Sequence, residues 1–598
     1  MIVRGDVPVG RYSMRKSIAA ALAATTLGFV VGLEPASAQR ALTPVTDAML
    51  REPAPVDWLM WRRTLNSWGY SPLDQIDRSN VARLQQVWSR PLGPGLQEGT
   101  PLVHDGVLFM PNPSDYIQAM NAATGELLWE YKRKWPDDLT KVFPVPAINR
   151  NLAIYGTAII DTSADDYVFA LDGMSGKLLW ETQIVDFRKN AAQETSGPII
   201  ANGKIISTRG CEPKGGPEAC VMTAHDAKTG KELWRSYTIP RPGEPGNETW
   251  GDIPYENRWH VGAWMVPSYD PELNLVYVGT SVTSPAPKFM LAGNDKKYLY
   301  HNCTLALNAD TGKIVWYYQH IVDHWDFDHP FERLLVDTVV RPDPANVRWI
   351  NPKLKAGERR KVVTGIPGKT GVVYTLDRET GEFLWATPTV SQNVISSIDG
   401  TGAVNVNPAS LFTAAGQERA ICPGVNGGKN WPAGAYSPLT NTMYYPLQNL
   451  CMGATSTDDK PSLKSLYALA MKGRIAEGTD KVGTVQAISA ETGAITWKYE
   501  QRAGMLSLVT TGGGLIFGGD ANGRFRAFDQ KDGKVLWETN LGAPVTGYPV
   551  TFAVDGRQYV AASTGPSLVT SGLNALTPEL QTPNGSSLFV FALPGNRP

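Results

Sequence analysis

Seven copies of one short pattern run along the chain, and each copy ends in Trp. A copy such as "AMNAATGELLW" holds an apolar pair, a polar turn with Gly and a second apolar run, which predicts strand, tight turn, strand. The copies end at Trp129, Trp180, Trp234, Trp316, Trp385, Trp497 and Trp537. Unrelated hairpins would not place Trp at one offset after Gly seven times. A unit this small cannot bury its hydrophobic face alone, so the copies must stack.

The repeat predicts an all-β fold, and among these an eight-bladed β-propeller. Trp88 in "LQQVW" is a degenerate eighth member, so the two ends of the chain are expected to close one blade together. Uneven gaps between the Trp residues place inserted loops between repeats, where binding residues are expected. Long amphipathic helices are hard to find in the sequence, which agrees with an all-β protein.

The first forty residues have the composition of an export signal. Met14-Arg15-Lys16 gives a positive start, "SIAAALAATTLGFVVGL" an apolar run, and "ASA" at 36–38 a small-residue cleavage site. We therefore expect a signal peptide over residues 1–38, and a single propeller domain with inserted loops over residues 39–598. The mature protein is expected in the periplasm or outside the cell. A membrane anchor is the weaker interpretation, because the apolar run is short.

The net charge and the cysteine content indicate which partners, disulfides and cofactors are expected. The formal net charge is -1, so no attraction to nucleic acid or to an anionic membrane is expected. No later segment approaches about 18 uninterrupted apolar residues, so no membrane insertion is expected. The five cysteines indicate two disulfides and one free thiol in an oxidising compartment. The sequence has no C-x-x-C-H motif and gives no reason to expect a covalently attached c-type haem.

The stretch "HWDFDHP" places Asp326 and Asp328 two residues apart between aromatic rings. In an extended segment the two carboxylates point the same way, and like charges repel unless something lies between them. An EF-hand is disfavoured because Pro330 and Phe331 stand where that loop needs a ligand and a Gly. A zinc hydrolase is disfavoured because "HIVDHWD" lacks the glutamate of H-E-x-x-H. From these residues alone, a metal ion, a proton or solvent between the carboxylates stay open.

The repeat A-x-D-x-x-T-G-x-x-x-W resembles the tryptophan-docking motif of the quinoprotein alcohol dehydrogenases, from about Trp61 to Ala592. The resemblance is to the soluble, haem-free type. It implies an eight-bladed propeller with pyrroloquinoline quinone (PQQ) on its axis beside a Ca²⁺ or lanthanide ion. It also implies that a small-molecule alcohol is oxidised in the periplasm and that the electrons leave through a soluble cytochrome c or another acceptor. The repeat carries the architecture, whereas activity depends on the site.

The same resemblance assigns cofactor contacts segment by segment. In "GAWMVPSYDP" the register from Tyr269-Asp270-Pro271 implies that Trp264 stacks beneath the quinone. "GIPGKTGVVYTLDR" aligns Lys369 with the cation that polarises the reactive carbonyl. Arg209 stands where the family has a small residue, and would add a cation for the carboxylates of PQQ. The set implied by the resemblance is Glu98, Arg150, Thr195, Arg209, Gly210, Cys211, Trp264, Lys369 and Asn430.

Catalytic and metal-binding residues follow in the same way. "YYQHIVDHWDFD" resembles W-x-Y-Q…W-D-x-D, which implies Asp326 as the catalytic base and Asp328 as a metal ligand. "TRGCE" implies Glu212 as a further ligand, with Glu218 as its rival. The usual Asn ligand is missing from "GTSVTSPAP", so Thr283, Ser284 or water is expected in its place. The metal set is therefore Glu212, Asp326, Asp328 and Thr283. An Asp at the second position favours a lanthanide over calcium, since a trivalent ion favours an extra negative oxygen.

Two disulfides are expected. Cys422 and Cys451 match a disulfide of the family in their flanking residues, "ICP" and "LCM". Cys211 and Cys220 flank Glu212, and a bond between them would fix that carboxylate; two unpaired thiols are the alternative.

Besides the missing Asn ligand, two departures from the family concern the substrate pocket. The vicinal Cys-Cys of methanol-type members is replaced by about Pro144-Val145, and a Trp of the last blades by a residue near Met505. The long insertions "SPAPKFMLAGNDKKYLYHN" and "TSTDDKPSLKSLY" suggest a wider mouth. We expect a primary or secondary alcohol larger than ethanol rather than methanol. Candidates include polycyclic alcohols such as trichothecene mycotoxins of the deoxynivalenol type.

A different function stays open beside the enzyme. A non-catalytic propeller that serves as a scaffold for outer-membrane protein assembly would share the Trp repeat without a cofactor. Such a scaffold has no reason to keep Glu212, Trp264, Asp326, Asp328 and Lys369 together, which favours the dehydrogenase.

Overall fold

The computed structural model describes residues 41–143, 148–212, 215–462 and 465–595. The predicted signal peptide and Pro144-Val145 lie outside these residues. Every element below belongs to one unit that begins at Leu42. The described part of the unit is mostly β, as predicted, with three short α-helices at α1 (Asp47–Arg51), α2 (Leu139–Val142) and α3 (Leu568–Leu576).

Eight sheets of four or five strands make up most of the described chain. The first sheet joins strands from both ends: β2 (Gln85–Pro91), β41 (Ser587–Ala592), β40 (Arg557–Thr564) and β39 (Val550–Val554). The second contains β3 (Leu102–His104), β4 (Val107–Asn112), β5 (Tyr116–Asn121) and β6 (Leu127–Lys132). The third contains β7 (Ala153–Tyr155), β8 (Ala158–Thr162), β9 (Tyr167–Asp172) and β10 (Leu178–Gln183). The fourth contains β12 (Ile199–Ala201), β13 (Lys204–Thr208), β15 (Val221–Asp226) and β16 (Glu232–Tyr237).

The other four sheets follow in chain order. The fifth contains β17 (Ser268–Asp270), β18 (Leu275–Gly279), β19 (Cys303–Asn308) and β20 (Ile314–Gln319). The sixth contains β21 (Leu334–Val340), β23 (Glu358–Gly365), β24 (Val372–Asp377), β25 (Phe383–Pro388) and β22 (Trp349–Ile350). The seventh contains β29 (Ala435–Ser437), β30 (Thr442–Gln448), β33 (Gly483–Ser489) and β34 (Ile495–Gln501). The eighth contains β1 (Tyr70–Ser71), β35 (Met505–Thr511), β36 (Leu515–Asp520), β37 (Arg524–Asp529) and β38 (Val535–Asn540).

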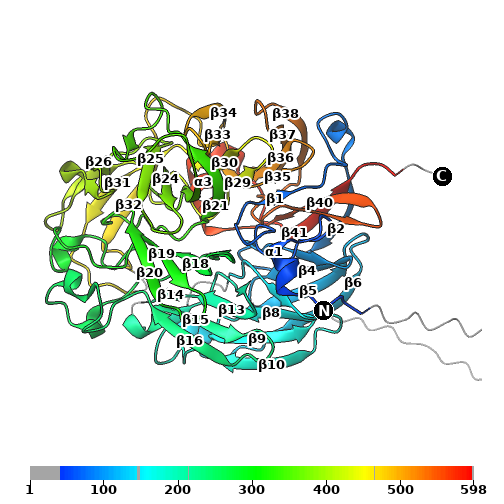
Figure 1. Ribbon diagram of the computed structural model, residues 1–598, viewed down its shortest axis with the longest axis horizontal. Helices are drawn as coiled ribbons and strands as arrows, with labels where there is room; N and C mark the ends of the chain where they lie inside the picture. Colours follow the sequence, from blue (N-terminus) through cyan, green and yellow to red (C-terminus); the bar gives the residue numbers. More distant parts are fainter. Residues whose placement is uncertain (1–40, 144–147, 213–214, 463–464, 596–598) are drawn as a thin grey trace, which may run out of the picture. The chain divides into compact units, whose positions relative to one another are not determined.

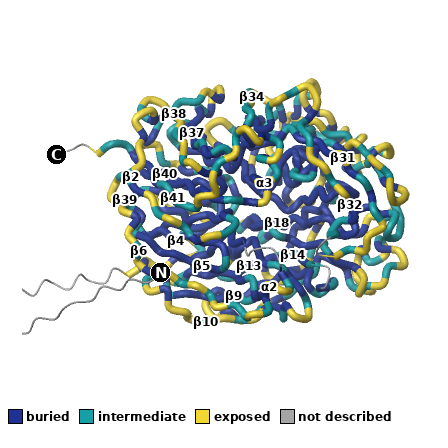
Figure 2. The backbone as a smooth tube through the Cα atoms, turned by 180° about the vertical axis from the view of Figure 1, so that it is seen from behind, coloured by how far each residue is buried: buried dark blue, intermediate teal, exposed yellow. Residues whose placement is uncertain are grey.

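Three smaller sheets lie in the connections between the large ones. They contain β11 (Ala192–Gln193) with β14 (Gly210–Cys211), β26 (Ile395–Ile398) with β27 (Val404–Val406), and β28 (Glu418–Ile421) with β31 (Leu450–Ser456) and β32 (Leu469–Ile475). The strands of the large sheets pair antiparallel except β1, which runs parallel to β35. Figure 1 shows the large sheets following one another in a closed circuit, so that β2 and β41 lie side by side. Most strands are buried, the last strands of several sheets, such as β6, β10, β34 and β38, are partly exposed, and the turns are mostly exposed (Figure 2).

The Trp of one repeat contacts the turn of the next repeat. The indole N–H of Trp129 donates to the carbonyl of Gly173 at 2.9 Å, and that of Trp234 to Ala309 at 2.9 Å. The circuit closes in the same way, because the indole of Trp537 donates to Leu84 at 3.0 Å. The repeat needs its Gly for two reasons, shown at Gly176: its φ is +69°, and a Cβ there would collide with the Trp129 ring. The Gly of each copy is therefore needed both for the turn and for the contact with the Trp of the preceding copy.

The cysteines pair as predicted. Cys211 is bonded to Cys220, and Cys422 to Cys451. Cys303 is the free thiol and is buried in β19. Within the described ranges, none of the helices is both long and apolar enough to span a bilayer.

Candidate active site

A cavity of about 350 Å³ is lined mainly by residues of the connections between strands, together with the small sheet of β11 and β14 and the start of α3. Its volume is in the range of small-molecule sites. The predicted cofactor and metal residues among its lining are Glu98, Arg150, Thr195, Gly210, Cys211, Glu212, Trp264, Asp326, Asp328, Lys369 and Asn430. These come from segments that are up to 332 residues apart, between Glu98 and Asn430. The structure therefore brings together all but two of the residues that the sequence assigned to the site.

One side of the cavity combines an indole face with a cation. The guanidinium of Arg150 lies over the Trp264 ring, 5.2 Å from the ring centre, and its NH2 is 2.6 Å from Oε2 of Glu98. Its NH1 donates to the Thr195 carbonyl at 2.9 Å. Burial raises the pKa of Glu98, and Arg150 offsets part of that rise. A flat π surface beside a fixed guanidinium and a hydroxyl is complementary to a planar, aromatic carboxylate.

Two aspartates share one ammonium on the other side of the cavity. Nζ of Lys369 is 2.9 Å from Oδ1 of Asp326 and 3.4 Å from Oδ2 of Asp328. All three side chains are buried. The backbone of Asp326 has φ of +70°, a left-handed conformation that costs about 1–3 kcal/mol and persists only where the surroundings impose it.

The two carboxyls differ in their proton affinity. Burial raises the pKa of Asp326 well above its usual value; Lys369 opposes that rise, and Asp328 adds to it. Burial also tends to raise the pKa of Asp328. The charges of Lys369 and His260, together with a hydrogen bond from the Val282 N–H, outweigh this effect, so the pKa of Asp328 lies below its usual value. A carboxyl of raised basicity beside a fixed cation is the arrangement that a general base requires.

The predicted metal ligands do not form a compact cluster. Among the described residues, no three or more His, Cys, Asp or Glu side chains lie close enough together to hold one ion. Asp326 and Asp328 turn instead toward Lys369. The donor chemistry still fits a hard cation, because Glu212, Asp326 and Asp328 place three carboxylates around a cavity with a single lysine.

The rival ligands of the sequence analysis are occupied elsewhere. Glu218 pairs with Arg241 at 2.8 Å and accepts from the Tyr255 hydroxyl at 3.1 Å, which leaves Glu212 as the carboxylate of this loop that lines the cavity. The Ser284 hydroxyl donates to the Leu466 carbonyl. Thr283 is buried, its hydroxyl has no hydrogen-bond partner among the described residues, and it is not part of the cavity lining.

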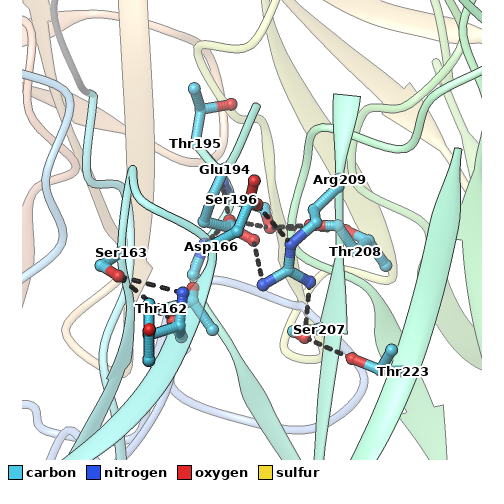
Figure 3. A network of polar contacts seen from close by, with 12 residues as sticks. Thr162, Ser163, Asp166, Glu194, Thr195, Ser196, Ser207, Thr208, Arg209 and Thr223 are labelled. Atoms are coloured by element: carbon cyan, nitrogen blue, oxygen red, sulfur yellow. Dashed lines mark hydrogen bonds and ion pairs between the residues drawn. The ribbon is translucent and has the colours of Figure 1, made fainter. Parts of the chain in front are cut away.

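Arg209 is the second predicted residue whose side chain is not brought to the cavity. Its Nε lies 3.0 Å from Oδ1 of Asp166, its NH1 donates to the Ser207 hydroxyl at 3.1 Å, and its NH2 is 3.7 Å from Glu194. Figure 3 shows the guanidinium directed toward Asp166 and Ser207. The charge that Arg209 was predicted to offer to a ligand is taken up by two buried carboxylates, because an unpaired carboxylate would be costly there.

Sequence analysis missed several residues of the cavity wall. His260 donates from Nδ1 to the Val282 carbonyl at 3.0 Å, and its ring lies 5.5 Å from that of Tyr467. Trp431 adds a second indole, 6.0 Å from the Arg150 guanidinium. The rest of the wall combines apolar and polar residues: Ile148, Gln193, Ser281, Val425, Asn426, Leu466, Leu568 and Val569. Two signals were available, because Trp431 follows Asn430 directly and Leu466 and Tyr467 end the second inserted loop; His260, Leu568 and Val569 stand in segments with no motif. Met505 lies in the core of β35 and does not reach the wall.

Known proteins share this fold, and comparison with them identifies the family. The described chain is a mostly-β protein with a cavity of small-molecule size. The model of the PQQ family described as glucose/ethanol/alcohol dehydrogenase, β-propeller domain, matches residues 58–397 and 460–560. The chain belongs to this family of PQQ-dependent alcohol dehydrogenases and is an enzyme.

Relatives match over most of their length. The dehydrogenase subunit of alcohol dehydrogenase (quinone) from Komagataeibacter europaeus is 31% identical over 86% of this chain and 72% of the relative. Quinoprotein alcohol dehydrogenase PedH from Pseudomonas putida is 30% identical over 83% of this chain and 84% of the relative. The solved structure of a europium-containing methanol dehydrogenase superposes with a TM-score of 0.80 at 26% identity, over 92% of this chain and all of that one.

The solved structure of the quinohemoprotein alcohol dehydrogenase ADHIIG from Pseudomonas putida superposes with a TM-score of 0.81 at 27% identity, over 94% of this chain and 85% of that one. The mostly-β fold is therefore a propeller like those of the PQQ alcohol dehydrogenases. The similar proteins include quinohemoproteins as well as a quinoprotein, so the haem-free type stays a prediction.

Replacing Trp264 with Ala should weaken PQQ binding by about 1 kcal/mol or more, which is roughly a fivefold rise in Kd. The reason is the loss of the flat face opposite Arg150. Absorbance titration of the apo-protein with PQQ measures the effect, with Trp264→Phe as a control that keeps an aromatic face. An unchanged Kd in Trp264→Ala would mean that the register from Tyr269-Asp270-Pro271 is wrong.

Proposed function

We propose that this protein is a periplasmic PQQ-dependent dehydrogenase that oxidises an alcohol larger than ethanol to the aldehyde or ketone. The observation that carries the proposal is the Lys369–Asp326 pair in a cavity whose other side is formed by Trp264 and Arg150. One half of that cavity suits a planar anionic cofactor, and the other half suits removal of a proton from an alcohol.

Each of these cavity residues has a separate role in the proposed reaction. Bound PQQ would supply an electrophilic quinone carbonyl that accepts hydride from the alcohol carbon. Asp326 takes the proton of the alcohol hydroxyl, for which it needs hydrogen-bond reach and an ionised carboxylate. Lys369 keeps a positive charge next to that carboxylate, and it stabilises negative charge that develops on an oxygen in the cavity. Arg150, Thr195 and Asn430 orient the carboxylates of the cofactor.

Electron transfer and location complete the proposal. The electrons pass to a soluble cytochrome c or to another acceptor, without a haem in this chain. The signal-like composition of residues 1–38 supports export to the periplasm. The eight large sheets, linked by Trp contacts such as Trp129 to Gly173, support eight tryptophan-docked blades.

The apolar part of the wall supports a substrate larger than ethanol. Val425, Leu466, Leu568 and Val569 come from three separate segments and lie on the same cavity as Asp326. Apolar side chains there would contact a hydrocarbon body rather than the single carbon of methanol. Secondary and polycyclic alcohols, including trichothecenes of the deoxynivalenol type, are therefore part of the substrate panel below.

A metal ion is proposed beside Asp328 and Glu212. It would act as a Lewis acid and keep nearby carboxylates deprotonated. The europium-containing methanol dehydrogenase superposes on most of this chain, and an extra carboxylate at Asp328 suits a trivalent ion, which supports a lanthanide, with Ca²⁺ as the alternative.

Replacing Asp328 with Ala should impair activation by La³⁺ more than activation by Ca²⁺. Removing a negatively charged oxygen ligand weakens the binding of a trivalent ion more than the binding of a divalent ion. The concentration of each ion that gives half-maximal dye-linked activity measures the effect. Equal losses for both ions would contradict the preference, and a wild-type protein that responds to Ca²⁺ but not to La³⁺ would leave only the calcium site.

The proposed function is tested by reconstitution. Purified apo-protein is supplied with PQQ and either Ca²⁺ or La³⁺, and dye reduction is followed with a panel of methanol, 1-butanol, 2-octanol, a cyclic secondary alcohol and deoxynivalenol. We expect activity only with both PQQ and metal, and with a higher kcat/KM for the larger alcohols. Methanol as the best substrate would contradict the pocket argument. Failure to bind PQQ would favour the scaffold function instead.

A further inference from the structure

The segment that holds Asp326 and Asp328 is organised by a third aspartate, Asp323. Oδ1 of Asp323 accepts a hydrogen bond from the Trp325 N–H at 2.7 Å, and Oδ2 accepts one from the Phe327 N–H. The side chain is fully buried. Both carboxylate oxygens therefore bind the backbone on the two sides of Asp326, in a segment with no strand hydrogen bonds.

A second group, Asn302, binds the same loop from the position just before β19. The amide Nδ2 of Asn302 donates to Oδ2 of Asp323 at 3.2 Å and to the Phe327 carbonyl at 3.0 Å. The backbone of Asp323 is held as well, because its N–H donates to Nε2 of His301 at 3.1 Å. Nδ1 of His301 lies 2.9 Å from the Tyr298 carbonyl, which can only accept, so the ring has its proton on Nδ1 and offers Nε2 as an acceptor.

His301 and Asn302, which hold this loop, are the last two residues of the long insertion that precedes β19. The sequence suggested that this insertion widens the mouth, but its first part, 284–288, is buried. Lys288 is fully buried there, and its Nζ donates to the Ala286 carbonyl at 2.6 Å. Among the described residues no carboxylate forms an ion pair with Lys288, and Asp323 is the carboxylate that its charge acts on. Burial lowers the pKa of the Lys288 ammonium to about 7, and the charge of Asp323 opposes that fall.

We propose that Asp323 is a positioning residue of the alcohol oxidation, which holds Asp326 in its left-handed conformation facing Lys369 and Asp328 on the metal side of the cavity. The proposal rests on the proposed function, since it gives Asp326 and Asp328 their roles there. A left-handed Asp costs free energy that the surroundings must supply, and Asp323 with Asn302 fixes the peptides on either side of it. Residues that orient the groups of a site typically change activity or metal affinity by a factor of about 10–100 when replaced.

The test variant is Asp323→Asn. An amide has one acceptor oxygen, so its NH₂ would face one of the two backbone N–H groups and leave that donor unpaired. We expect kcat to fall about 10- to 100-fold and the La³⁺ or Ca²⁺ concentration for half-maximal activation to rise by a similar factor. The Kd for PQQ, measured by absorbance with apo-protein, should stay within about twofold, because Asp323 forms no hydrogen bond with Arg150, Glu98 or Trp264 among the described residues.

A matched control separates positioning from stability. Asp520 is also buried and accepts two backbone N–H groups, from Asn522 and Arg524, both at 2.9 Å, but it does not line the cavity. Asp520→Asn should lower Tm by a comparable amount and leave kcat and the half-activating metal concentration at the wild-type values.

A second variant keeps the proposal testable if Asp323→Asn does not fold. Asn302 has φ of +49°, so Asn302→Gly keeps the backbone conformation and removes only the amide. The same changes in kcat and metal activation are expected in a weaker form. Calorimetric titration of the PQQ-loaded variants with Ca²⁺ and La³⁺ provides a readout that is independent of turnover.

The outcomes are distinct. If Asp323→Asn and Asn302→Gly lose stability but keep kcat and both metal affinities, Asp323 is a structural residue and the proposal is wrong. If wild type binds PQQ and metal but oxidises no alcohol, the proposed function fails, whereas the calorimetric comparison still decides whether Asp323 positions the metal side of the cavity.

Discussion

Replacing Asp326 with Asn should lower kcat by a factor of about 10²–10⁴ while PQQ stays bound, because the amide cannot take a proton. The size of the side chain is unchanged, so the loop and its left-handed backbone are kept; Asn tolerates that conformation well. Oδ1 can still accept from Nζ of Lys369, which keeps the ammonium in place. Single-turnover reduction of bound PQQ, followed by absorbance, isolates the chemical step from electron transfer to the dye.

The matched control for Asp326→Asn is Asp270→Asn. Asp270 is also buried and pairs with a cation, Arg378, at 2.9 Å, but it does not line this cavity. The control should lose stability without loss of single-turnover rate. If Asp326→Asn reduces PQQ at the wild-type rate, another group removes the proton and the assignment from "HWDFD" is wrong.

The fold could be predicted well from local patterns because each copy of the repeat contains the residues that pack against its neighbouring copies. The Trp of each copy meets the Gly of the next copy, as Trp129 meets Gly176, so one repeated pattern encodes both the turn and the contact between neighbouring sheets. Such a rule repeats along the chain and can be read from it. The order of the sheets then follows from chain order, and only the closure by β2 and β41 needs the two ends together.

The site was predictable where a residue stands in a motif. Trp264, Lys369 and the two aspartates all lie on the cavity, as the motifs implied. The argument from alternation along an extended segment was less accurate, because Asp326 has φ of +70° and the segment is a loop. The two carboxylates face the same way because Lys369 attracts both.

The contacts that sequence reasoning missed depend on partners far along the chain. Arg209 was assigned to the cofactor from its neighbours in sequence, but its direction is set by Asp166, 43 residues earlier. His260 and Tyr467 meet although about 200 residues separate them; Tyr467 ends an inserted loop that was noticed, but nothing in the sequence pairs it with His260. A buried charge goes to the partner that satisfies it, and that partner is known only once the chain has folded.

Replacing Lys369 with Ala should lower kcat by a factor of about 10²–10³ and change the Kd for PQQ far less. A fixed cation acts mainly on charge that develops during hydride transfer, so its removal is felt in the transition state more than in binding. The ammonium is also the only cation within ion-pair distance of Asp326 and Asp328 among the described residues. Its loss leaves two buried carboxylates facing each other, which adds a cost in stability.

Lys369→Arg separates these two effects. Arg keeps the positive charge between the carboxylates, so it should restore Tm, and it should restore part of kcat if charge is what the reaction needs. The comparison of Tm, PQQ affinity and single-turnover rate across wild type, Lys369→Ala and Lys369→Arg measures each contribution. A Lys369→Ala variant that binds PQQ and turns over like wild type would show that the ammonium serves only to keep Asp326 and Asp328 apart, and that the developing charge is stabilised by the metal ion alone.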